Sequence, residues 1–407
     1  MWDRHPACPQ WTREWGKVFQ CSAGASATGH RRTGWKPVLH RPATPPRAVD
    51  NRGFRPYLHN AVASTPAKPI MRHFPTLPLI ACIIAASRLM ADPISEITSF
   101  SVFKEVDMKK LAKGDVIAAS GPTMKFARGL EVESLFILAM PVAKANEAQQ
   151  KWDGSRHSEL KVYQHVDLPR HPSAQDFQRI AAAPRNSSVG KFISATEKLN
   201  PERPELQMSA AEAKGAGKFE SGAKGVMPPG VAAFWSGLLH GRTNAFLSGG
   251  LKGQPAYAGR SGAARPADEA AELLRECPSI RRQFSALADT MTGSGGSPAL
   301  FYELFDVEGR AALSLGATYS RAASESIQSG TVQFYSSDGF YVLLSFSQMW
   351  PVQVDGKPAT LVWRADMLAS SQLGELHGIE RSGSSVAMRK EIHKNISAMV
   401  KDISSQR

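Results

Sequence analysis

The chain has 407 residues, and its formal net charge of +13 at pH 7 would suit a nucleic-acid-binding protein. Residues 1–91 carry most of this excess, with 13 Lys and Arg against 3 Asp and Glu, so the remaining chain has a net charge of only +3. A nucleic-acid-binding surface needs its basic groups concentrated on the folded part of the protein. The charge distribution therefore argues against nucleic acid as a partner.

Residues 1–70 are rich in Pro and Arg and show neither helical nor strand periodicity. They resemble translated repetitive bacterial DNA, so we expect a disordered or misassigned upstream extension rather than part of the fold. A transit peptide is the alternative, because the segment is basic and poor in acidic residues. Its scattered Trp and Pro residues disfavour the amphipathic helix that such a peptide forms.

A bacterial secretory signal peptide is predicted at residues 71–91. Met71 opens a short basic start, residues 74–87 are apolar, and Ala91 is a small residue before a polar segment. We therefore expect the exported protein, periplasmic or secreted, to begin near Asp92. The apolar stretch is too short for a transmembrane helix, which takes about 20 residues.

Only one of the four cysteines belongs to the predicted mature chain. Cys8 and Cys21 precede the signal peptide and Cys82 lies within it, which leaves Cys277 alone. An exported protein with one cysteine has no internal disulfide, so an apolar core must stabilise it. An alternative follows from residues 79–82, which fit a lipobox and would make Cys82 the lipid anchor of a lipoprotein.

The first strong element of the mature chain is a strand over residues 130–140. Leu130, Val132 and Phe136 share one face, opposite Glu131 and Glu133. A helix is predicted to follow at residues 143–152. Residues 173–298 then lose the strand pattern and predict a helical insertion, with helices at 173–183, 187–199, 209–214, 230–248, 266–276 and 278–291.

After Pro298 the apolar period changes from that of a helix to that of a strand. Residues 299–368 alternate, and Glu308-Gly309, Asp338-Gly339 and Asp355-Gly356 separate the alternating runs. A short acidic-glycine pair between such runs indicates a β-hairpin. We therefore predict an antiparallel meander.

The chain ends in a strongly amphipathic helix. Ile392, Ile396 and Met399 fall on one stripe, and Ser384 or Ser385 is a suitable N-cap. The predicted fold class is α+β: an antiparallel meander packed on a long C-terminal helix, formed by 92–172 and 299–407, with the helical insertion at 173–298. This order of elements resembles the helix-grip superfamily of START, polyketide-cyclase and Bet v 1-like proteins. The chain also resembles a family of exported bacterial proteins without an assigned role.

The resemblance implies an apolar cavity between the sheet and its last helix. On strand 359–368, Trp363 would share the inward face with Leu361, while Arg364 and Asp366 would face water. The alternative is that the same side chains fill a solid core. The predicted ligand-binding residues are Phe340, Val342, Leu344, Phe346, Leu361, Trp363, Ile392, Ile396 and Met399.

The sequence contains only incomplete matches to known catalytic and metal-binding motifs. His157, His165 and His171 lie near acidic residues, but their spacing matches no defined ligand motif, so no metal or cofactor is predicted. Ser188-x-x-Lys191 and Ser221-x-x-Lys224 fit the nucleophile pattern of penicillin-recognising enzymes without its companion motifs. We therefore assign no catalytic residue.

The best interpretation is a non-catalytic protein that binds an apolar small molecule between the sheet and the C-terminal helix. Two alternatives stay open. One is a hydrolase-like enzyme whose site is assembled from separate loops, and the other is a structural or interaction protein.

Overall fold

The computed structural model describes residues 92–219, 226–258 and 263–405, all of which belong to one compact unit. A second unit, Gly24–Met90, lies wholly outside the described residues. The predicted upstream extension and signal peptide, with Cys8, Cys21 and Cys82, also lie outside them.

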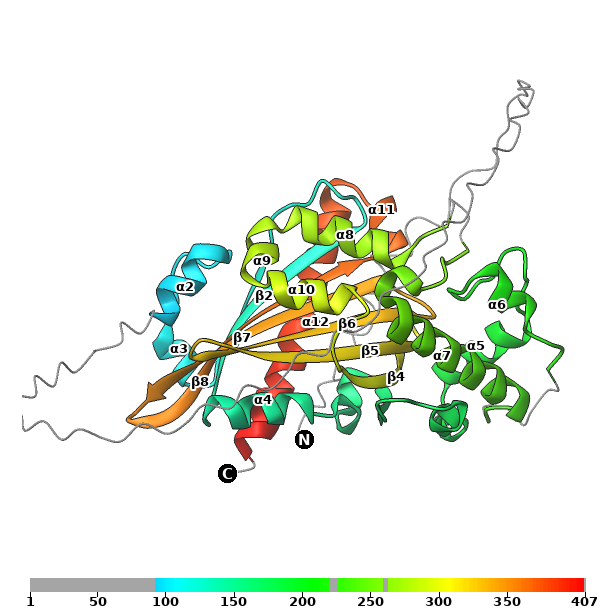
Figure 1. Cartoon of the computed structure of the whole chain (residues 1–407), viewed down its shortest axis with the longest axis horizontal. Helices are drawn as coiled ribbons and strands as arrows, with labels where there is room; N and C mark the ends of the chain where they lie inside the picture. The colour runs from blue at the N-terminus through cyan, green and yellow to red at the C-terminus, as the bar shows by residue number, and fades with distance from the viewer. Residues whose placement is uncertain (1–91, 220–225, 259–262, 406–407) are drawn as a thin grey trace, which may run out of the picture. The chain divides into compact units, whose positions relative to one another are not determined.

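The centre of the described unit is an antiparallel eight-stranded sheet in the order β1-β2-β8-β7-β6-β5-β4-β3. With the helices around it, this sheet confirms the predicted α+β class (Figure 1). The strands are β1 (Ile117–Ser120), β2 (Gly129–Leu138), β3 (Val162–Leu168), β4 (Ala299–Val307), β5 (Arg310–Ala323), β6 (Ser326–Ser336), β7 (Val342–Val354) and β8 (Lys357–Ala369).

Strands β4 to β8 form the predicted meander, and strands from the first part of the chain extend it on both sides. Two of the predicted turns are tight: Glu308-Gly309 has φ values of 52° and 80°, and Asp355-Gly356 has φ values of 50° and 71°. These left-handed values match the right-handed twist of the strands that each turn joins. Asp338-Gly339 lies in a longer connection between β6 and β7.

One face of the sheet packs against helices from residues 173–298 and from the start of the described chain. Gly330 lets helix α10 approach β6, because a Cβ there would lie 2.2 Å from the sulfur of Met291. The helices are α2 (Pro93–Phe100), α3 (Met108–Ala112), η4 (Ala174–Ala182), α5 (Ser187–Glu197), α6 (Ala210–Lys214), α7 (Pro229–Gly249), η5 (Gly250–Gly253), α8 (Pro266–Glu276), α9 (Pro278–Gln283) and α10 (Ser285–Thr292).

The predicted helix at 278–291 is interrupted at Phe284. This residue separates α9 from α10 with φ −109° and ψ 25°. Its ring is fully buried and stacks on Trp363 of β8, with 5.5 Å between ring centroids. The break therefore coincides with a tertiary aromatic contact.

The opposite face packs against α12 (Gly378–Ser405), with α4 (Val142–Gln150), α11 (Ser371–Glu375) and the short turns η2 (Gly154–Arg156) and η3 (Ser158–Leu160) around it (Figure 1). Ile396 and Met399 of α12 belong to a buried cluster with Phe136 of β2 and Val362 of β8. The C-terminal helix is therefore docked on the sheet.

The predicted N-cap of this helix is wrong. Helix α12 begins at Gly378, so Ser384 and Ser385 lie inside it. The Ser384 hydroxyl donates to the Glu380 carbonyl (3.2 Å), and the Ser385 hydroxyl donates to the Ser120 hydroxyl (2.8 Å). Both serines therefore make contacts typical of a helix interior rather than of a cap.

Candidate functional site

A cavity of about 1310 Å³ lies between the sheet and α12. Its floor is formed by strands β3 to β8 and its walls by α12, the end of α4 and the η2–η3 region. We call it the sheet–helix cavity. Its volume exceeds the range of about 300–1,000 Å³ that is usual for small-molecule sites.

The floor of the sheet–helix cavity is polar because of strand alternation. Ser345 of β7 is opposite Thr331 of β6 and Asp366 of β8, and Thr331 is opposite Thr318 of β5. Residues paired in this way point to the same face of an antiparallel sheet. A row of polar side chains therefore crosses the floor, and the full set is Thr318, Ser329, Thr331, Gln333, Ser345, Ser347, Arg364 and Asp366.

An ion pair lies in this row. Arg364 donates from Nε (2.8 Å) and Nη2 (2.6 Å) to the Asp366 carboxylate, which also accepts from the Ser345 hydroxyl (2.5 Å). The Asp366 side chain is 3% exposed and that of Arg364 is 33% exposed. Burial opposes the charge on Arg364, but Asp366 outweighs it and raises the pKa of the guanidinium. Arg364 therefore keeps its charge beside Asp366.

One end of the cavity is apolar. The rings of Phe305 and Phe340 stack there with 6.2 Å between centroids. Helix α12 adds four apolar side chains to the lining, Met388, Ile392, Ile396 and Met399, and polar ones between them. The apolar lining includes Leu130, Phe305, Phe340, Leu343, Leu368, Leu373, Met388, Ile392, Ile396 and Met399.

His165 lies at the other end, where β3 pairs with β4. Its Nδ1 is 2.9 Å from Glu303 Oε1 and its Nε2 is 3.4 Å from Asp167 Oδ1, while its ring stacks on Phe301. Burial opposes protonation, but Glu303 and Asp167 outweigh it and raise the pKa of His165. Both ring nitrogens of His165 face carboxylates, so neither is free to take a proton from a substrate, and His165 is a poor general base.

The other residues weighed for metal or nucleophilic chemistry do not converge on this site. His157 binds Asp402 (2.7 Å) and Glu159 (3.2 Å), and no group in the described part of the chain has the geometry of a metal site. The Ser188 hydroxyl donates to Asp306 (2.5 Å) rather than to Lys191. Ser221 and Lys224 lie outside the described residues.

The structure brings together only part of the predicted ligand site. Phe340, Ile392, Ile396 and Met399 contribute to the lining of the sheet–helix cavity. Phe346 borders the cavity, but its ring packs against Phe284 in the core on the opposite face. The remaining predicted residues are fully buried in the core on the opposite face, and these are Val342, Leu344, Leu361 and Trp363.

The predicted orientation of β8 is therefore reversed. Trp363 donates from Nε1 to Glu133 (2.7 Å) within the core, whereas Arg364 and Asp366 line the cavity. The physical reason is that helices cover the apolar face, so the polar face turns toward α12. The long polar rows of the meander were the sequence signal for the cavity floor.

Comparison of the chain with models of known families, with curated proteins and with solved structures gave no match. Within residues 92–405, as far as they are described, no helix has the length and apolar character needed to cross a membrane.

Proposed function

We propose that the protein is a non-catalytic binding protein that holds an amphipathic small molecule in the sheet–helix cavity. The observation that carries this proposal is the combination of apolar and polar side chains in the lining of the cavity. Helix α12 brings Met388, Ile392, Ile396 and Met399 to the lining, together with polar residues such as Lys390 and Asn395, and the sheet floor carries the polar row. Ligand sites typically combine an apolar lining with a few placed polar groups.

Two polar atoms support a bound ligand. Nη1 of Arg364 has no hydrogen-bond partner among the described residues, although Nε and Nη2 are both used. Nε2 of Gln149, which also lines the cavity, is buried without a partner. The buried Gln149 donor without a partner costs about 1–3 kcal/mol, which a ligand oxygen would offset. Nη1 of Arg364 is not buried, so it carries no such cost and is simply an available donor.

The arrangement of α12 over an antiparallel sheet supports a helix-grip relationship as part of this proposal. The hydrolase alternative would need a base beside a nucleophile, and the environment of His165 is unsuited to that role. Export from the cell stays a prediction, because it depends on residues 71–91.

The test uses the whole chain and a fluorescent amphipathic probe, 8-anilinonaphthalene-1-sulfonate, with the variant Leu343→Trp to fill the cavity. Val386→Trp is the matched control, because Val386 of α12 is 38% exposed and does not line the cavity. We expect saturable binding that weakens at least tenfold in Leu343→Trp and is unchanged in Val386→Trp. Equal binding by both variants would overturn the proposal.

A further inference from the structure

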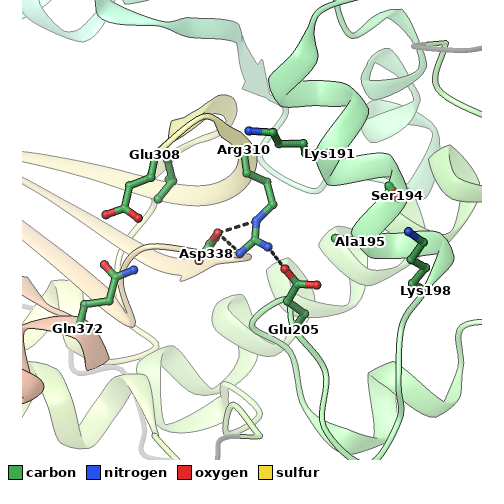
Figure 2. Close-up of a pocket in the computed structure, with 10 residues that line it drawn as sticks. Lys191, Ser194, Ala195, Lys198, Glu205, Glu308, Arg310, Asp338 and Gln372 are labelled. Atoms are coloured by element: carbon green, nitrogen blue, oxygen red, sulfur yellow. Dashed lines mark hydrogen bonds and ion pairs between the residues drawn. The ribbon is translucent and has the colours of Figure 1, made fainter. Parts of the chain in front are cut away.

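A second pocket, of about 450 Å³, lies between α5 and the turns at the ends of β4 and β6. We call it the charged pocket. Figure 2 shows Lys198 and Ser194 on the α5 side, Glu308 and Gln372 on the other, and Arg310 between them.

Arg310 is not available to a ligand. It donates to Asp338 Oδ2 from Nε (2.9 Å) and Nη2 (2.5 Å), and its Nη1 binds Glu205 (Figure 2). Burial opposes its charge, but Asp338 and Glu205 outweigh burial and raise the pKa of Arg310. This network is an internal feature of the pocket wall.

Three other charged groups have no such partners. Lys191 and Lys198 are seven residues apart on α5, which places them on the same face of the helix. Neither lysine, nor Glu308, has an ion-pair or side-chain hydrogen-bond partner among the described residues. The pocket therefore offers two free cations from α5 and one free carboxylate from the β4–β5 turn, and the Lys191 ammonium extends to that turn beside Gly309.

Glu308 occupies a turn position that is unusual for Glu. It is the first central residue of the β4–β5 turn, with φ +52°, where Asn, Asp or Gly is usual. The equivalent residue in the β7–β8 turn is Asp355 (φ 50°). In Figure 2 the Glu308 side chain extends away from α5, on the side of Gln372.

The charged pocket adjoins the sheet–helix cavity. Val307, Glu308 and Gln372 line both. The adjacent end of the cavity is the apolar one, where Phe305 and Phe340 stack. A chain lying in that end would bring its polar head to the charged pocket.

We infer that the charged pocket receives the zwitterionic head of a single-chain amphiphile, with its anionic group at Lys191 and Lys198 and its ammonium group at Glu308. This inference rests on the proposed function, because the sheet–helix cavity holds the chain. A head with both charges suits a pocket that presents free charges of both signs. Phosphocholine and phosphoethanolamine heads have this chemistry.

The experiment compares probes that share a dodecyl chain but differ in their heads, by calorimetry on the whole chain below each critical micelle concentration. Dodecylphosphocholine carries both charges, dodecanoate only the anion, dodecyltrimethylammonium only the cation, and dodecyl maltoside neither. We expect dodecylphosphocholine to bind at least tenfold more tightly than the other three. Free phosphocholine, tested alone, should bind far more weakly than dodecylphosphocholine.

Charge-removing variants test which residue binds each charge of the head group. Lys191→Gln with Lys198→Gln should weaken dodecylphosphocholine about tenfold or more and leave dodecyl maltoside unchanged. Glu308→Gln should remove the advantage of dodecylphosphocholine over dodecanoate. The matched controls, Lys357→Gln and Glu325→Gln, change exposed charges that line neither cavity and should have no effect.

The outcomes separate the two proposals. Binding of all four probes with equal affinity, unaffected by the lysine and Glu308 variants, would overturn the head-group inference and leave the proposed function standing. Binding of none of the dodecyl probes would overturn both. Binding of free phosphocholine as tightly as dodecylphosphocholine would show an independent solute site and overturn the link between the two cavities.

Discussion

Trp363 and Arg364 are neighbours on β8, yet they face different environments. Trp363 lies in the helix-covered core against Phe284, and Arg364 forms an ion pair with Asp366 on the floor of the sheet–helix cavity. The one strand therefore contributes to stability on one face and to the candidate site on the other.

The first prediction concerns the core face. Trp363→Ala should cost roughly 3–5 kcal/mol of unfolding free energy, because a fully buried large side chain is lost and Glu133 loses a donor. Urea denaturation followed by circular dichroism measures this. A loss below about 1 kcal/mol would mean that Trp363 does not pack in the core.

The second prediction concerns the ion pair. Arg364→Met should destabilise the protein by about 3 kcal/mol, because it leaves the Asp366 carboxylate buried without its partner. This value is at the lower end of the range for buried ion pairs, because the Arg364 side chain is one third exposed. The double variant Arg364→Met with Asp366→Leu should recover most of that loss. If the double variant were as unstable as the single one, the cost would come from packing rather than from the unpaired charge.

The third prediction concerns pH and two buried carboxyls of β2. Burial raises the pKa of Glu131, whose Oε2 accepts from the Cys277 thiol (3.0 Å). Burial and the neighbouring Glu131 raise the pKa of Glu133 to about 8. A raised folded-state pKa means that the folded protein binds more protons than the unfolded chain, so stability falls as pH rises.

The contribution of Glu133 should be complete below its unfolded pKa, near 4.5, and should be lost as pH rises through about 8. Urea midpoints between pH 5 and pH 9 should therefore fall more steeply for the original chain than for Glu133→Gln. Parallel profiles for the two proteins would show that Glu133 does not hold a proton in the fold.

The fourth prediction concerns the docking of α12. Ile396 is 1% exposed, so Ile396→Ala should cost roughly 2–5 kcal/mol. Val386→Ala on the exposed side of the same helix should change stability by less than about 0.5 kcal/mol. Equal melting temperatures for the two variants would mean that α12 is not held on the sheet.

The sequence was enough to predict elements whose pattern is local. The meander of 299–368 follows from alternation and acidic-glycine turns, and the helices between 173 and 298 follow from their Gly and Pro boundaries. The start of α12 was missed because it depends on tertiary contacts. Arg381, in its first turns, donates to the carbonyls of Phe126 and Gly129, far away in the sequence.

The candidate site was harder to predict because both faces of the sheet are covered. Alternation separates two faces but does not tell which one meets α12, so the apolar face was assigned to the cavity. The charged pocket was beyond local reasoning, since Lys198, Glu308 and Gln372 come from distant segments.

The most direct test of the central claim is to locate a bound amphiphile. A dodecylphosphocholine analogue with a diazirine on its chain would be photolysed on the protein and the labelled residues mapped by mass spectrometry. The account predicts labels at Leu343, Met388 and Ile392, suppressed by excess unlabelled dodecylphosphocholine, and none at Val386. Labelling spread over exposed surfaces, with no suppression by competitor, would contradict it.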